Sequence, residues 1–170
     1  MIIAVDTRER KPYFLSPGLD CPKVITCRTT LKTGDYSIVG HFDQVTIERK
    51  SLSDFWVSIT RGRDRFKREI QRMAEIPCRA VVVEATLDQA LGTRVAGRKF
   101  GSEVVIGTVK SWNAKYGVPF LFLGDRATAE QFTLQYLTSF YNDTKKNHLK
   151  CRQDVENVNA DRKDISYGRL

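Results

Sequence analysis

Two short apolar runs constrain the fold of this chain more than any other feature. Ala80-Val-Val-Val83 predicts a central strand buried on both faces of a sheet, and Val118-Pro-Phe-Leu-Phe-Leu123 predicts another buried strand. A helix is predicted before the second run, over residues 102–116 with Gly117 as its stop, and after it from about 128 to 141. Residues 1–5 predict a further buried strand. Strands that alternate with helices in this way indicate an α/β fold.

The rest of the chain predicts a loop and five further elements. The loop is a glycine-rich, basic stretch at 91–101, which we expect to be mobile. The other predicted elements are a strand at 23–29, two hairpin arms at 34–39 and 44–50 joined by 40–43, a helix at 54–59 capped by Ser53, and a helix at 64–74.

The charge of the chain favours a polyanionic partner, most simply nucleic acid. The 170 residues include 28 Lys and Arg against 20 Asp and Glu, a formal net charge of +8. The excess is shared between the N-terminal half and the tail, and residues 55–72 form a basic patch in the first half. The loop at 91–101 adds three basic side chains. A solvated helix face is the alternative interpretation. The candidate DNA-binding residues are Arg61, Arg63, Arg65, Lys67, Arg68, Arg94, Arg98 and Lys99.

Several classes of protein are excluded by the sequence. No apolar run is long enough to cross a membrane, and charges from Asp6 onward interrupt any signal peptide. The four cysteines form no CxxC pair and only two histidines are present, which argues against structural zinc. We therefore expect a reduced cytoplasmic or nucleoid-associated protein. We expect one domain over 1–142, followed by a polar, basic tail at 143–170 that is peripheral or partly disordered.

Acidic residues gather at one predicted edge of the sheet. Antiparallel pairing of the hairpin arms can bring Asp35 beside Glu48, and Lys50 lies two residues further along the same strand face. A carboxylate pair beside a lysine suits phosphodiester hydrolysis with Mg²⁺, which prefers oxygen ligands. The alternative without a function is that Glu48 and Lys50 are an ordinary surface pair and that Asp35 is a turn residue. Convergence with Asp6, Glu9 and Asp54 favours the metal site, because so many acids would otherwise repel one another.

Three motifs resemble the signature of the XPF/Mus81-type nuclease domain, also called the ERCC4 domain. They are Val5-Asp-Thr-Arg-Glu9, Leu31-Lys-Thr-Gly-Asp-Tyr36 and Ile47-Glu-Arg-Lys-Ser-Leu-Ser-Asp54, and they match the family pattern of GD followed by ERKxxxD. The resemblance covers residues 1–141. It implies a restriction-endonuclease-like fold, with a mixed central sheet flanked by helices. It also implies a Mg²⁺- or Mn²⁺-dependent DNA endonuclease that favours branched, flap or fork substrates.

The resemblance also implies roles for the motif residues. Asp35 and Glu48 would be the principal metal ligands, with Asp6 a further acid at the metal. Lys50 would position the attacking water, and Arg49 would hold the scissile phosphate or a metal-bound carboxylate. Arg8, Glu9 and Asp54 would complete the site or its surroundings.

Two further expectations depend on the family. Its pseudo-nuclease subunits scaffold an active partner without cleaving DNA, so a non-catalytic binding module is the competing hypothesis. The sequence after Tyr141 is too short for the tandem helix-hairpin-helix modules of cellular members, which indicates a stand-alone nuclease, of viral or mobile-element origin, or a fragment. Family nuclease domains also pair through their last helices, so a homodimer is one hypothesis, with core packing of the same residues favoured over it. The candidate dimer residues are Phe132, Tyr136, Phe140 and Trp112.

Overall fold

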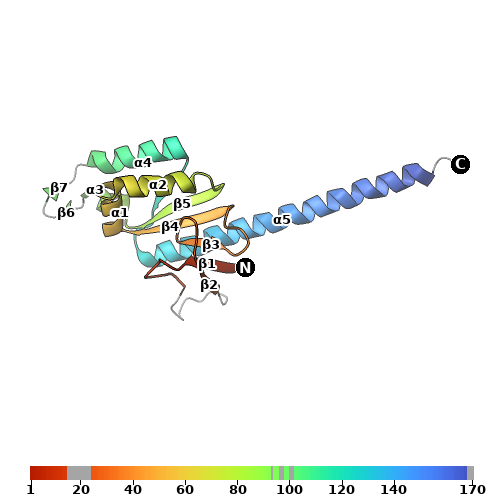
Figure 1. Cartoon of the computed structure of the whole chain (residues 1–170), viewed down its shortest axis with the longest axis horizontal. Coiled ribbons are helices and arrows are strands. Elements are labelled where there is room, and N and C mark those ends of the chain that lie inside the picture. The colour runs from red at the N-terminus through yellow and green to blue at the C-terminus, as the bar shows by residue number, and fades with distance from the viewer. Residues whose placement is uncertain (15–23, 93, 96–97, 100–101, 168–170) are drawn as a thin grey trace.

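The computed structural model describes residues 1–14, 24–92, 94–95, 98–99 and 102–167, and side chains at 1–14, 24–92 and 102–153. A mixed six-stranded sheet with strand order β2-β1-β3-β4-β5-β8 forms the centre of the molecule (Figure 1). Its strands are β1 (Ile2–Asp6), β2 (Ile25–Thr29), β3 (Tyr36–Ile38), β4 (Val45–Ser51), β5 (Cys78–Glu84) and β8 (Phe120–Phe122).

The sheet joins antiparallel and parallel pairs. Strand β3 is antiparallel to both β1 and β4, and the pairing of Tyr36 with Ile47 is the predicted hairpin. Parallel pairs join β1 to β2, β4 to β5 and β5 to β8. The predicted α/β architecture with a mixed sheet is therefore confirmed.

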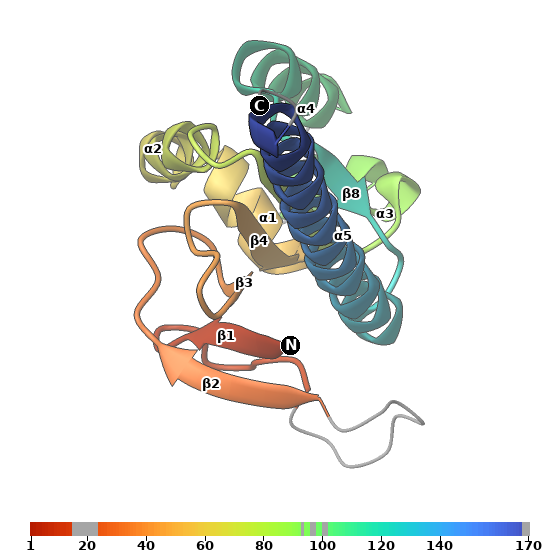
Figure 2. The same ribbon diagram turned by 90° about the vertical axis from the view of Figure 1, so that its right-hand side faces the viewer.

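Helices cover both faces of the sheet. On one face lie α1 (Leu52–Ile59), α2 (Arg63–Met73) and α4 (Ser102–Tyr116), and on the other lies α5 (Arg126–Tyr167). Figure 2 looks along α5 as it crosses the sheet. Because side chains alternate along a strand, β5 directs Val81 and Val83 to the first core and Ala80 and Val82 to the second.

The starts of α1 and α2 differ from the sequence-based prediction, whereas the end of α4 agrees with it. Helix α1 is capped by Ser51 rather than Ser53, and α2 begins at Arg63. Helix α4 ends as predicted at Gly117, whose φ of +60° favours glycine.

The final helix is longer than the sequence predicted. It continues past Tyr141 to Tyr167, so the predicted tail at 143–167 is helical and projects away from the sheet (Figure 1). The division of the chain at residue 142 into domain and tail stays a prediction. No helix in the described part of the chain combines the length and apolarity needed to cross a membrane.

The predicted basic loop at 91–101 is only partly described. Its first residues belong to α3 (Leu87–Gly92), and β6 (Arg94–Val95) pairs with β7 (Arg98–Lys99) as a small two-stranded ladder. Residues 93, 96–97 and 100–101 lie outside the described residues, so the predicted mobility is not tested.

Candidate active site

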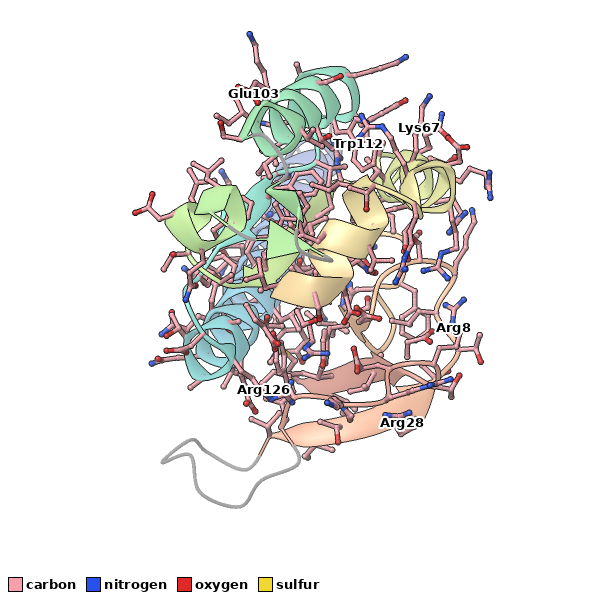
Figure 3. The ribbon with its side chains drawn as sticks, turned by 90° about the vertical axis from the view of Figure 1, so that its left-hand side faces the viewer. Arg8, Arg28, Lys67, Glu103, Trp112 and Arg126 are labelled. Carbon is pink, nitrogen blue, oxygen red and sulfur yellow. The ribbon has the colours of Figure 1, made fainter. Side chains whose placement is uncertain are left out.

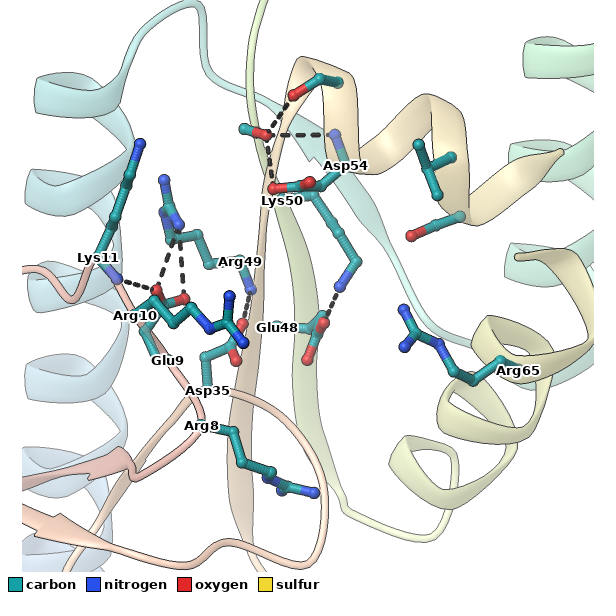
Figure 4. Close-up of a pocket in the computed structure, with 14 residues that line it drawn as sticks. Arg8, Glu9, Arg10, Lys11, Asp35, Glu48, Arg49, Lys50, Asp54 and Arg65 are labelled. Carbon is teal, nitrogen blue, oxygen red and sulfur yellow. Dashed lines mark hydrogen bonds and ion pairs between the residues drawn. The ribbon is translucent and has the colours of Figure 1, made fainter. Parts of the chain in front are cut away.

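A pocket of about 490 Å³ lies where the end of β4 meets the start of α1 (Figure 4). Its walls come from the segment after β1, from the hairpin, from β4 and from α1 and α2. The structure thus brings together most of the residues that the motifs predicted. Those that line the pocket are Arg8, Glu9, Asp35, Glu48, Arg49, Lys50, Asp54 and Arg65.

The backbone of the hairpin fixes Asp35 in this pocket. Gly34 has a φ of +77°, and a Cβ at that position would fall on the hydroxyl of Thr46. The Asp35 amide donates to the Ile47 carbonyl at 2.8 Å, and the Arg49 amide donates to Asp35 Oδ2 at 2.8 Å. The carboxylate of Asp35 is therefore held by β4.

Glu48 lies beside Asp35 with one oxygen paired and one open. Its side chain faces α1 and α2 and is 3% exposed. Lys50 Nζ donates to Glu48 Oε1, whereas the buried Oε2 has no hydrogen-bond partner among the described residues. The Lys50 ammonium also lies 4.8 Å from the centre of the Phe66 ring in α2, which holds it on the same side of the sheet.

The pKa values of these groups reflect crowded buried charge. Burial raises the pKa of Asp35 from 3.8 to about 7, although Lys50 opposes this effect. Burial and then the charge of Asp35 raise the pKa of Glu48 well above 4.5. Burial alone would lower the pKa of Lys50, but Glu48, Glu69 and Asp35 raise it above 10.5. Glu69 of α2 is an acid that the motifs did not reveal.

The carboxylate pair fits a hard divalent cation. Burying two like charges next to one lysine is unfavourable, and the open Glu48 Oε2 is an acceptor without a donor. No cluster of three or more His, Cys, Asp or Glu side chains suited to a metal occurs in the described residues. Two carboxylates are nevertheless sufficient for Mg²⁺, which usually keeps several waters and uses substrate phosphates as further ligands.

Comparison with known proteins identifies the family. Residues 5–136 match the family model of the ERCC4 domain. The chain belongs to the ERCC4 domain family.

Two solved structures share the fold. One is XPF from Aeropyrum pernix, with a TM-score of 0.64 and 22% identity over 91% of this chain and 73% of that chain. The other is XPF from Aeropyrum pernix in complex with DNA, with a TM-score of 0.59 and 24% identity over 85% of this chain and 66% of that chain. A search of curated proteins gives no match. The restriction-endonuclease-like fold that the motifs implied is thereby confirmed.

In this ERCC4 domain Asp6 lies behind the pocket and not in its described lining. Its Oδ1 accepts from Arg8 N and Nε, both at 2.7 Å, and its Oδ2 accepts from Arg8 Nη2 at 3.0 Å and from the Leu31 amide at 2.7 Å. Burial would raise the pKa of Asp6, but these bonds lower it below 3.8. The Asp6 amide also donates to the Asp35 carbonyl at 2.9 Å, so the structure places Asp6 next to Asp35, but the Asp6 carboxylate oxygens are engaged by Arg8 and the β2–β3 connection. Its role as a further acid at the metal stays a prediction.

The Arg49 guanidinium pairs in the ERCC4 domain with two carboxylates that were not predicted to bind the metal, so its predicted role at the scissile phosphate or at a metal-bound carboxylate stays a prediction. Its Nε and Nη2 donate to Glu84 Oε1 and Oε2, both at 2.7 Å, and its Nη1 lies 3.5 Å from both oxygens of Glu9. The motifs did not reveal Glu84. An acid directly after the buried Ala80–Val83 run, at the sheet edge where the other acids gather, was the available signal.

Asp54 lies on the rim of the pocket, at the start of α1. Its amide donates to Ser51 Oγ at 3.2 Å, and Ser51 Oγ donates to Asp54 Oδ2 at 2.7 Å. This pairing caps α1 and places a further, solvent-exposed acid in the pocket that contains Asp35 and Glu48.

The predicted basic residues divide into two groups. Arg65 points from α2 toward Glu48 in Figure 4, and Arg61, Lys67 and Arg68 are exposed. Arg63 is different, because it donates to Thr108 Oγ1 at 2.7 Å and stacks 5.0 Å from the ring of Trp112. The side chains of Arg94, Arg98 and Lys99 lie outside the described residues.

Cations also border the opposite side of the pocket. Arg10 and Lys11, which the motifs did not reveal, line it together with Arg8, whose side chain is 66% exposed. Figure 3 shows Arg8 and Lys67 on the same side of the molecule, with Arg126 on the other. The acid pair therefore lies between two basic borders, one from the segment after β1 and one from α2.

Proposed function

We propose that this protein is a metal-dependent DNA endonuclease. The observation that carries the proposal is the buried pair of Asp35 and Glu48, with Glu48 Oε2 lacking a partner and Lys50 beside it. Membership of the ERCC4 domain family supports the same reaction class. The similar XPF from Aeropyrum pernix in complex with DNA supports nucleic acid as the substrate.

The site residues have separate tasks in this reaction. Asp35 and Glu48 would hold Mg²⁺ or Mn²⁺, which supplies Lewis acidity and lowers the pKa of water. Lys50 orients the attacking water and offsets negative charge that develops on the phosphate. Arg8, Arg10, Lys11 and Arg65 bind the phosphates on either side of the scissile bond.

The preference for branched, flap or fork DNA is the finer part of the proposal. It rests on the resemblance of the GD and ERKxxxD motifs to XPF/Mus81-type nucleases. Two basic borders on one pocket agree with a substrate whose backbone continues on both sides of the cut, as a duplex beside a junction would provide.

The experiment compares cleavage of end-labelled linear duplex, single strand, 3′-flap and fork DNA in Mg²⁺, Mn²⁺ or EDTA. Asp35→Ala and Glu48→Gln test the site, and Asp43→Ala is the matched control at an exposed acid. We expect metal-dependent cutting of the branched substrates by the wild type and the control only. DNA binding without cleavage in every metal would support the pseudo-nuclease alternative and refute the enzyme.

We also propose that two copies pair through α5. Phe132, Tyr136 and Phe140 are only partly buried and line a groove of about 590 Å³ on this helix. Trp112, the fourth predicted dimer residue, is 3% exposed and packs in the core against Phe66, so it is excluded from this surface. Sedimentation velocity of wild type and Phe140→Glu tests the pairing, and a wild type that is monomeric at micromolar concentration would refute it.

A further inference from the structure

A second charged cluster lies on the α5 side of β4, behind the acid pair. Its centre is Glu84, the last residue of β5, whose side chain is 9% exposed. Glu84 accepts both bonds from Arg49, one from Tyr13 Oη at 3.0 Å and one from Arg126 Nη1 at 3.3 Å. Three donors from three separate segments therefore meet at one buried carboxylate.

Glu84 is the main counter-charge of Arg49. Both carboxylate oxygens bond the guanidinium at 2.7 Å, whereas the contacts with Glu9 are 3.5 Å long. Burial alone would lower the pKa of Arg49, but these hydrogen bonds to Glu84 raise it above its usual value. Arg49 is 9% exposed, so the loss of its main partner would leave a largely desolvated cation.

Two carboxylates lie near a released Arg49: Glu9, 3.5 Å from its Nη1, and Asp35 of the acid pair, which contacts its backbone. The Arg49 backbone amide donates to Asp35 Oδ2 at 2.8 Å, so the Asp35 carboxylate lies next to the backbone of Arg49. Glu9 is the other neighbour, and both Asp35 and Glu9 line the pocket. A guanidinium without Glu84 would turn toward these carboxylates, since a buried cation needs a partner.

The same cluster positions the segment after β1. Arg126, the first residue of α5, donates to the carbonyls of Lys11 and Pro12 at 2.9 and 2.8 Å. Its guanidinium and that of Arg49 both lie over the ring of Tyr13, at 4.9 and 5.6 Å. Glu84 thereby joins β4, β5, α5 and the pocket wall that carries Glu9, Arg10 and Lys11.

We propose that Glu84 is a positioning residue of the site: it holds the Arg49 guanidinium away from Asp35 and so keeps the acid pair free to bind a divalent cation. The inference rests on the proposed function, because it assumes that Asp35 and Glu48 bind the metal. Glu84 does not line the described pocket and its oxygens are occupied, so it acts through Arg49 rather than as a ligand.

The test measures Mn²⁺ binding without DNA, by the loss of the free Mn²⁺ signal in electron paramagnetic resonance. Glu84→Gln removes the charge, and Glu75→Gln is the matched control at an exposed glutamate that pairs only with Lys32 in the described residues. We expect Glu84→Gln to weaken Mn²⁺ binding about 10- to 100-fold, as changes around metal ligands commonly do. The control keeps wild-type affinity.

A double variant separates positioning from mere stability. Glu84→Gln combined with Arg49→Gln removes the released cation, so we expect Mn²⁺ affinity to return to within about threefold of wild type. A purely structural role of Glu84 predicts the opposite, a double variant that binds no better than Glu84→Gln. That result would overturn the inference, as would wild-type affinity in the single variant.

Stability and cleavage complete the design. Where Glu84→Gln fails to fold, Glu84→Asp keeps the charge on a shorter side chain. For Glu84→Asp we expect Mn²⁺ affinity to fall about two- to fivefold, and an unchanged Mn²⁺ affinity would overturn the inference. A wild type that binds Mn²⁺ but cleaves no substrate would refute the proposed function alone. Unchanged Mn²⁺ affinity of Glu84→Gln, with cleavage by the wild type, would refute the positioning role alone.

Discussion

Replacing Asp35 by Asn should stabilise the metal-free protein while it abolishes cleavage. Burial raises the pKa of Asp35 from 3.8 to about 7, so its ionised form is disfavoured in the folded state. Asn has the same shape and its Oδ1 can still accept from the Arg49 amide, which now donates to Asp35 at 2.8 Å. The variant therefore removes the buried charge and keeps the hydrogen bond.

The magnitude follows from linkage. A folded pKa of about 7 against 3.8 in the unfolded chain means that the folded state holds the proton more tightly between these values. The free energy of unfolding of the wild type therefore falls, relative to Asp35→Asn, as pH rises from about 4 to about 7. The full difference corresponds to about 4 kcal/mol, and because the pocket admits water we expect about 2–4 kcal/mol at pH 8.

The assay is urea unfolding in EDTA at pH 4, 5, 6, 7 and 8, followed by tryptophan fluorescence. Trp56 and Trp112 are buried and report the loss of the first core. Asp43→Asn makes the same chemical change at an exposed position and should differ from wild type by less than about 0.5 kcal/mol. Saturating Mn²⁺ should stabilise the wild type and not Asp35→Asn.

One result would refute the reasoning. If Asp35→Asn is no more stable than wild type at pH 8 in EDTA, the Asp35 carboxylate is not under the electrostatic stress that the pocket implies. The same conclusion follows if the difference between the two proteins is as large at pH 4 as at pH 8.

Four other substitutions test the site more briefly. Lys50→Ala should lower single-turnover cleavage by several orders of magnitude while DNA binding in EDTA, measured by fluorescence anisotropy, persists; comparable cleavage would disprove the role of this lysine. Arg65→Ala should weaken DNA binding and reduce the slope of log affinity against log salt by about 1, because Arg65 lines the pocket. Arg63→Ala should leave that slope unchanged. It should instead lower the free energy of unfolding by about 1–3 kcal/mol, because the bond to Thr108 is lost. Gly34→Ala should cost about 2–4 kcal/mol in chemical denaturation, because its φ of +77° and the lack of space both oppose a side chain; a loss under 1 kcal/mol would contradict the tight approach to β4.

Local patterns were sufficient to predict the acid pair. Strand alternation places Glu48 and Lys50 on one face, and an antiparallel hairpin brings Asp35 beside them, so two short-range rules determine three positions. The apolar runs at 80–83 and 118–123 predicted their strands for the same reason, since an apolar run is a local pattern. The prediction that the second strand is buried was wrong, because β8 spans only Phe120–Phe122 and lies half-buried at the edge of the sheet.

Tertiary contacts determined what the sequence analysis missed. The Asp6 carboxylate accepts from the amide of Leu31, which the fold brings from 25 residues along the chain. Helix α5 runs past Tyr141 through polar sequence in which apolar periodicity is weak, so its end was not visible. A second signal was available for the Glu84 cluster. Arg126 is the first residue of a helix, where the helix dipole disfavours a cation, so a carboxylate close to it was to be expected.

Charge balance, rather than the number of acids, distinguishes the two charged clusters on either side of β4. The cluster on the α5 side is neutral, with two cations and two anions, namely Arg49, Arg126, Glu84 and Glu9. The pair on the other side has two carboxylates and one ammonium, namely Asp35, Glu48 and Lys50. Ionising both carboxylates would leave an excess negative charge in a buried site that already contains an acceptor without a donor. A cation supplied from solvent can balance the charge of the acid pair, whereas the neutral cluster around Glu84 needs none. The neutral cluster can therefore keep its arginine paired and out of competition for the cation that the acid pair requires.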